Sequence, residues 1–219
     1  MRALPWLGVA GATTLGLLNL LNLAGGAYAA YAERRIDQAP GGGVLAASEH
    51  AANLTPWSAR RTALAGWILA ERGRAEDSRA AYGHALAAAP ADAVLWGEFA
   101  LALARTGHYE LLELPTRQAR ALAPASPAVQ SANAAMAISY WERGTPAVRA
   151  TWTQAVRYEL DHEREPFLRS VIARGRTDLF CAELAPGLRE TAWCDRIRKA
   201  ADECRRQQTG DDMLCILND

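Results

Sequence analysis

The sequence predicts an all-α protein, and three observations support that fold class. Alanine supplies 47 of the 219 residues, which favours helix over sheet. Apolar segments of helical length recur with the same turn signals 34 residues apart. A run of thirty residues near the N-terminus carries no charged side chain. We therefore expect an N-terminal transmembrane helix, a series of helix pairs, and a helical C-terminal cap stapled by disulfides.

The composition excludes several classes of function. Lys and Arg total 24 and Asp and Glu total 24, so the chain lacks the basic excess that anchors nucleic acid. We expect no nucleic-acid partner. A hydrophobic share of 50% excludes a wholly disordered chain, and 219 residues are too few for a large multidomain enzyme. Abundant alanine with 23 arginines and one lysine indicates a GC-rich bacterial genome.

Residues 1–35 are predicted to form a membrane anchor. The uncharged run covers residues 3–32, and a helix needs about 20 apolar residues to cross a bilayer. A cleaved signal peptide is the alternative, because Ala27-Tyr28-Ala29 and Ala30-Tyr31-Ala32 resemble small-residue cleavage sites. Both interpretations place the following residues outside the cytoplasm. The expected location is the bacterial inner membrane, single-pass, with the soluble domain in the periplasm and residues 36–43 as a flexible linker.

The four cysteines all fall in the last 39 residues, as in a disulfide framework formed in an oxidising compartment. Their spacings of 13, 10 and 11 contain no close pair of the kind that structural zinc sites use, so we expect no metal site. The helix predicted over 188–207 separates its two cysteines by about 15 Å, beyond disulfide reach. Turn signals lie midway between Cys181 and Cys194 and midway between Cys204 and Cys215, so each of these pairs would face each other across a hairpin. We therefore expect these two disulfides, with Cys181–Cys204 and Cys194–Cys215 as the alternative.

Residues 44–160 contain helical repeats. Gly73 and Gly107 lie 34 residues apart, and so do Pro90 and Pro124. The first two copies predict helix pairs over 59–72 with 75–89 and over 93–106 with 109–123, and a less regular third copy runs from 128 to 160 with its turn at Gly144. Residues 161–219 depart from the repeat and predict three further helices, which would cover its last apolar face.

This period and these markers resemble the tetratricopeptide-repeat family over residues 44–160, which implies a short right-handed superhelix of helix pairs. The chain departs from the family at Thr62, where tryptophan is usual. Pro115 should kink or split the returning helix of the second copy, because proline removes a helix hydrogen bond.

The N-terminal anchor, the returning helix that ends at Pro90, residues 123–130 and the helix that holds Trp141 also resemble the VpsP-like accessory proteins of bacterial polysaccharide export systems. That resemblance implies an accessory role in exopolysaccharide biosynthesis or export, without catalytic residues. The sequence itself contains no phosphate-binding loop, dinucleotide-binding motif or nucleophile elbow. We expect neither enzymatic activity nor a cofactor.

The family resemblance implies a concave groove lined by the outgoing helix of each pair. Tryptophan and arginine dominate binding hot spots, and tryptophan also stacks on sugars, although Trp67 and Trp141 would also suit a core. The candidate groove residues are Arg60, Trp67, Glu71, Leu101, Arg105, Ile138, Trp141 and Glu142.

Three functions are compatible with these features. The first is a scaffold or adaptor in the periplasm that binds a protein partner of a membrane-associated complex for exopolysaccharide biosynthesis or export. The second is a structural subunit of a secretion or pilus system. The third is a carbohydrate-binding module that contacts polysaccharide through Trp67 and Trp141.

Overall fold

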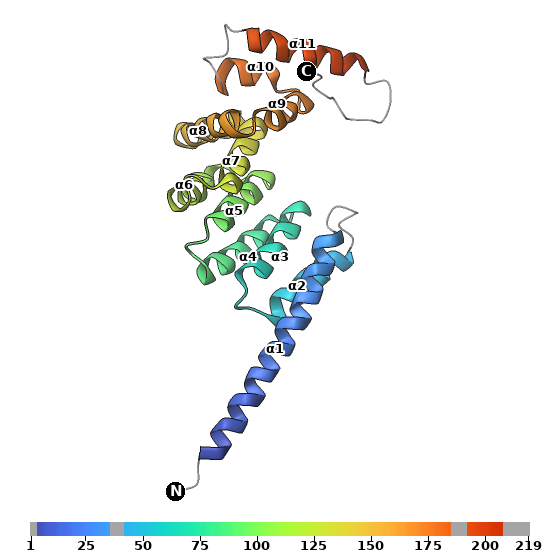
Figure 1. Ribbon diagram of the computed structural model, residues 1–219, viewed down its shortest axis with the longest axis vertical. Helices are drawn as coiled ribbons and strands as arrows, with labels where there is room; N and C mark the ends of the chain where they lie inside the picture. Colours follow the sequence, from blue (N-terminus) through green and yellow to red (C-terminus); the bar gives the residue numbers. More distant parts are fainter. Residues whose placement is uncertain (1–3, 36–41, 185–191, 208–219) are drawn as a thin grey trace. The chain divides into compact units, whose positions relative to one another are not determined.

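The computed structural model describes residues 4–35, 42–184 and 192–207, and all regular secondary structure within those ranges is helical (Figure 1). The chain divides into two compact units, residues 1–107 and residues 108–219. The all-α fold class is therefore confirmed.

The first unit consists of successive helices that each pack on their neighbours (Figure 1). Helix α1 packs on α2, α2 on α3, and α3 on both α4 and α5. The bounds are α1 Leu4–Arg35, α2 Gly42–Leu54, α3 Ala59–Glu71, α4 Ala75–Ala88 and α5 Ala93–Arg105. The residues predicted to begin and end the first helix pair agree with α3 and α4 to within one residue.

Turn chemistry explains these boundaries. Gly73 and Gly107 follow α3 and α5 with φ of 70° and 84°, a left-handed conformation that glycine adopts without steric cost. A Cβ atom at either position would meet nothing within 4 Å, so the requirement for glycine is conformational. The Asp92 side chain begins α5 by accepting a hydrogen bond from the Leu95 N–H at 3.1 Å. Both glycines therefore occupy the turns predicted for them.

The core of the first unit is built around Tyr82, which has 0% exposure. Its ring stacks on Phe99 with the ring centroids 5.4 Å apart. The ring also lies directly on Gly66, where a Cβ atom would come within 2.9 Å of the Tyr82 Cδ2 atom. The Ser78 hydroxyl donates to the Gly66 carbonyl oxygen at 2.7 Å, which joins α3 and α4 at the same point.

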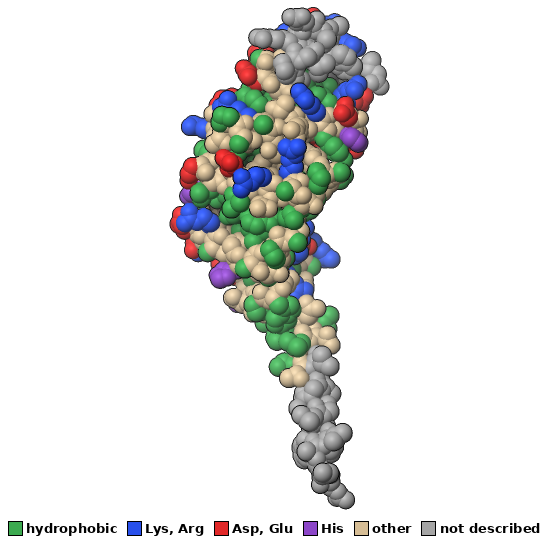
Figure 2. Space-filling view, turned by 90° about the vertical axis from the view of Figure 1, so that its left-hand side faces the viewer, with side chains coloured by type: hydrophobic (Ala, Val, Ile, Leu, Met, Phe, Trp, Pro, Cys, Tyr) green, Lys and Arg blue, Asp and Glu red, His purple; other side chains and the backbone are tan. Residues whose placement is uncertain are grey.

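Helix α1 has two different surroundings along its length. Toward its C-terminal end Ala29 and Ala32 are buried, and Arg61 of α3 donates to the Asn22 carbonyl oxygen at 3.1 Å. Along residues 17–23 four leucines are 45% to 72% exposed, and Figure 2 shows hydrophobic but no charged side chains on the described N-terminal end of the helix. The exposed leucines are Leu17, Leu18, Leu20 and Leu23.

Within the described ranges, no helix combines the length and the apolar character that spanning a membrane requires, so the structure does not confirm the predicted transmembrane helix of residues 3–32. The linker prediction is also corrected at one end. Gly42 and Gly43 already belong to α2, whereas we expected structure to resume at Val44. Residues 36–41 lie outside the described residues.

The second unit begins with the segment that contains Pro115. The 3₁₀ helix η1, Tyr109–Leu111, precedes α6, Glu113–Leu122, so the returning segment is split as predicted. Pro115 lies in the first turn of α6, where the missing N–H removes no helical hydrogen bond. The remaining elements are α7 Pro127–Tyr140, η2 Trp141–Arg143, α8 Pro146–His162, α9 Arg164–Ala173, α10 Thr177–Leu179, η3 Phe180–Leu184 and α11 Ala192–Gln207.

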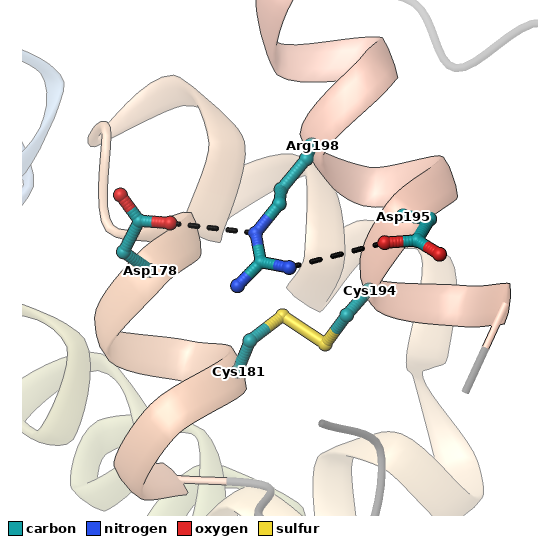
Figure 3. The surroundings of a disulfide bond; sticks show 5 residues. All are labelled: Asp178, Cys181, Cys194, Asp195 and Arg198. Atoms are coloured by element: carbon teal, nitrogen blue, oxygen red, sulfur yellow. Dashed lines mark ion pairs between the residues drawn. A yellow bond between two sulfur atoms is a disulfide. The ribbon is translucent and has the colours of Figure 1, made fainter. Parts of the chain in front are cut away.

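A disulfide joins Cys181 in the π-helical turn η3 to Cys194 in the first turn of α11, with a Cα–Cα distance of 6.0 Å (Figure 3). This bond confirms the first predicted pair and excludes the alternative pairing. Beside it, the Arg198 Nε atom lies 3.5 Å from an Asp178 carboxylate oxygen. Cys215 and the side chain of Cys204 lie outside the described residues, so the pair Cys204–Cys215 stays a prediction.

Substituting Gly66→Ala should destabilise the first unit. The added methyl group would force the Tyr82 ring off α3, and such overpacking typically costs about 1–3 kcal/mol, more than the helix propensity that alanine adds. Gly83→Ala is the matched control, because it lies in α4 with nothing within 4 Å of the added carbon and should raise the free energy of unfolding. Urea unfolding compares the two, and equal effects would contradict the close contact.

Reducing the Cys181–Cys194 bond should loosen α10 and α11 before the rest of the chain. A native disulfide in a small domain typically contributes about 2–5 kcal/mol, and this bond joins η3, which directly follows α10, to α11. Hydrogen exchange with and without reductant measures the effect, with α3 of the first unit as the internal control. Unchanged protection of α11 would show that packing alone holds it.

Candidate functional site

A pocket of about 330 Å³ lies in the first unit, where α3, α4 and α5 meet the end of α1. Helix α3 lines it with side chains at positions 60, 63, 64 and 67, a spacing that places them on one helix face. Helix α5 contributes Glu98 and Leu101, which are one turn apart. Tyr82 of α4 and Glu33 of α1 complete the lining.

An ion pair lies at the exposed side of this pocket. The Arg60 Nη1 atom donates to the Glu98 Oε1 atom at 3.0 Å, and the two side chains are 59% and 37% exposed. Partial burial raises the pKa of the Glu98 carboxyl, and the positive charge and hydrogen bond of Arg60 oppose that effect. Such an exposed pair stabilises a fold by only about 0–1 kcal/mol, so it can rearrange at little cost.

Tyr82 forms the buried part of the lining. Its hydroxyl is inaccessible to solvent and has no hydrogen-bond partner among the described residues. Burial raises the pKa of this phenol, and the negative charge of Glu98 raises it further. A buried polar group left without a partner costs about 1–3 kcal/mol, and among the residues that line this pocket the Tyr82 hydroxyl is such a group.

Trp67 is half-buried and forms one wall of the pocket. The Arg105 guanidinium lies 4.3 Å from the centre of its ring, in a cation–π contact, and Arg105 also forms an ion pair with Glu71. The five groove residues predicted in the first unit are therefore close together. Arg60, Trp67 and Leu101 line the pocket, whereas Arg105 contacts Trp67 from outside the lining and Glu71 pairs with Arg105.

The groove residues predicted in the second unit require a correction. Ile138 is only 1% exposed and Trp141 only 7% exposed, so both side chains belong to the core. The register fails because α7 ends at Tyr140 and the chain continues as a 3₁₀ turn, which rotates Trp141 away from the helical position we expected. The Arg149 guanidinium lies 5.4 Å from the centre of the Trp141 ring.

Glu142 remains exposed and joins two elements of the second unit. Its carboxylate accepts from Arg176 Nη2 at 2.5 Å, and Arg176 Nε also donates to the Ile138 carbonyl oxygen at 2.8 Å. A hydrogen bond from its own backbone N–H, followed by the contact with Arg176, lowers the pKa of Glu142. These contacts hold the segment after α9 against the end of α7, which is a structural role.

Five lining residues were absent from the predicted set: Glu33, Ala63, Leu64, Tyr82 and Glu98. Glu98 lies three residues before Leu101 on the same helix, so helical spacing could have found it. The Tyr82 ring is buried in the core, and no sequence pattern indicates that its hydroxyl is left without a partner among the described residues. Glu33 belongs to a segment that we had assigned to the membrane anchor, and no local pattern connects it to α3.

The arrangement provides recognition chemistry. It combines a half-buried aromatic wall, an ion pair and a buried donor in one small cavity. In the part of the chain that the structure describes, no group of His, Cys, Asp and Glu side chains could hold a metal ion. Comparison of the chain with family models, curated proteins and solved structures found no match.

Replacing Tyr82 by phenylalanine should stabilise the protein. Tyr82→Phe keeps the ring on Gly66 and Phe99 but removes the unpaired hydroxyl, so the free energy of unfolding should rise by about 1 kcal/mol. Tyr31→Phe is the control, since Tyr31 is 47% exposed and should change stability by less than about 0.5 kcal/mol. Urea unfolding measures both, and a loss of stability in Tyr82→Phe would mean that the hydroxyl is satisfied in solution.

Proposed function

We propose that this protein is a non-catalytic scaffold or adaptor that binds a segment of a protein partner through the pocket formed by α3, α4 and α5. The pocket around Trp67 carries the proposal. Binding energy at protein interfaces concentrates in aromatic and arginine side chains near a small, well-packed cavity, and Arg60, Trp67 and Arg105 provide both types here. A cavity of about 330 Å³ suits one or two anchoring side chains of such a segment.

The proposed place of action is the periplasmic side of the bacterial inner membrane. The Cys181–Cys194 disulfide supports an oxidising compartment, because the cytoplasm keeps most thiols reduced. The resemblance to VpsP-like proteins favours a complex for exopolysaccharide biosynthesis or export as the assembly. A secretion or pilus system is the alternative assembly with the same kind of binding.

Direct binding of polysaccharide is the weaker proposal. Sugar stacking needs an open aromatic face, but Arg105 covers one face of Trp67 and the Trp141 side chain is buried. Trp67 and Trp141 therefore do not offer a sugar two open aromatic faces. A protein segment can use the same pocket through hydrogen bonds and apolar contacts at its rim.

Photo-crosslinking in intact cells tests the proposed function. A benzoylphenylalanine at position 101, inside the pocket, should capture a subunit of a polysaccharide polymerase or export complex, whereas the same group at position 117, exposed on α6, should not. Adding Arg60→Ala and Trp67→Ala should reduce capture from position 101 at least fivefold while the chain stays folded. Capture of secretion or pilus subunits would favour the alternative assembly, and equal capture from both positions would exclude the pocket as the binding site.

A further inference from the structure

We propose that the pocket accepts a carboxamide side chain, glutamine or asparagine, from the partner segment. This inference rests on the proposed function, because it names the chemical group that the pocket would select. It is carried by two polar groups in one cavity, the unpaired Tyr82 hydroxyl and the Glu98 carboxylate.

Because the Tyr82 hydroxyl has no acceptor for its proton in the described part of the chain, we expect the ligand to supply a hydrogen-bond acceptor. The phenol carries one O–H donor, it has 0% exposure, and no partner for it occurs among the described residues. Tyr82 lines the same cavity as the exposed Arg60–Glu98 pair, and the proposal requires this pair to shift so that a ligand oxygen reaches the hydroxyl. A carbonyl oxygen there would receive the hydrogen bond that the free protein lacks.

Because the Glu98 carboxylate can accept further hydrogen bonds, we expect the ligand also to supply a hydrogen-bond donor. An ionised carboxylate accepts several hydrogen bonds, and Arg60 occupies the Oε1 atom. Partial burial also raises the pKa of Glu98, so a ligand N–H would offset the water that the carboxylate has lost. The apolar side chains of Leu64, Trp67 and Leu101 would contact the aliphatic stem of the ligand.

A carboxamide meets both requirements, because its carbonyl accepts and its NH₂ group donates. A ligand carboxylate would place a third negative charge beside Glu33 and Glu98, with Arg60 as the counter-charge in the lining. An ammonium group offers donors alone and would leave the Tyr82 proton unpaired. An apolar side chain would leave the Tyr82 hydroxyl without a partner and would offer the Glu98 carboxylate no donor besides Arg60.

Four small probes test this selection: the N-acetyl, N-methylamide derivatives of glutamine, glutamate, lysine and leucine. They share the backbone amides and differ in the side chain. Binding is followed by the ¹H–¹⁵N signal of the Trp67 indole, assigned with Trp67→Phe. We expect the glutamine probe to bind at least fivefold tighter than the other three. Preference for another probe, equal affinities or no shift with any probe would overturn the inference.

Tyr82→Phe then separates selection from folding. This variant should bind the glutamine probe at least fivefold more weakly while its melting temperature stays equal or rises, whereas the control Tyr31→Phe should bind as the parent does. If the hydroxyl instead served the fold, Tyr82→Phe would lower both the melting temperature and the affinity for the glutamine probe. Retained preference for glutamine in Tyr82→Phe would overturn the assignment. If photo-crosslinking from position 101 succeeds while the probes do not discriminate, the proposed function stands and the carboxamide selection alone fails.

Discussion

The contact between the Tyr82 ring and Gly66 is the constraint on which the first unit depends. Because position 66 has no side chain, α4 can lie close enough to α3 for the ring to cover the helix backbone. The Ser78 hydrogen bond to the Gly66 carbonyl joins the helices at the same level, and Phe99 of α5 stacks on the other side of the ring. The pocket lies beside this contact, because Tyr82 is also one of its lining residues.

Local chemistry explains how much of the fold could be predicted. Gly73, Gly107 and Pro115 act on their own backbone conformation, so their positions determined helix ends that the structure then showed. The 3₁₀ turn at Trp141 and the π-helical turn that holds Cys181 depend on tertiary contacts, and no residue pattern indicated them. The disulfide could still be predicted, since it required two cysteines on either side of a turn and not a particular helix type.

The same distinction applies to the candidate site. Helical spacing brought Arg60 and Trp67 of α3 to one face, which sequence can show. Spacing failed at Trp141 because α7 ends one residue earlier, and it failed at Ile138 because that position inside α7 faces the core. Glu33 joins the pocket from a helix that is distant in sequence, and only the packing of α1 through α2 onto α3 brings it there. A sequence pattern therefore shows which residues of one helix share a face, but not whether the rest of the fold buries that face.

The energetics of the pocket favour binding over pure stability. Folding usually eliminates unpaired buried donors, yet Tyr82 keeps one in the best-packed part of its unit. Phenylalanine would fill the same volume without that cost, so the hydroxyl contributes nothing to the free protein. A ligand acceptor would recover the lost hydrogen bond on binding, and the exposed Arg60–Glu98 pair can yield at small cost. Functional sites often retain groups that lower stability, and this is the role that we propose for the Tyr82 hydroxyl.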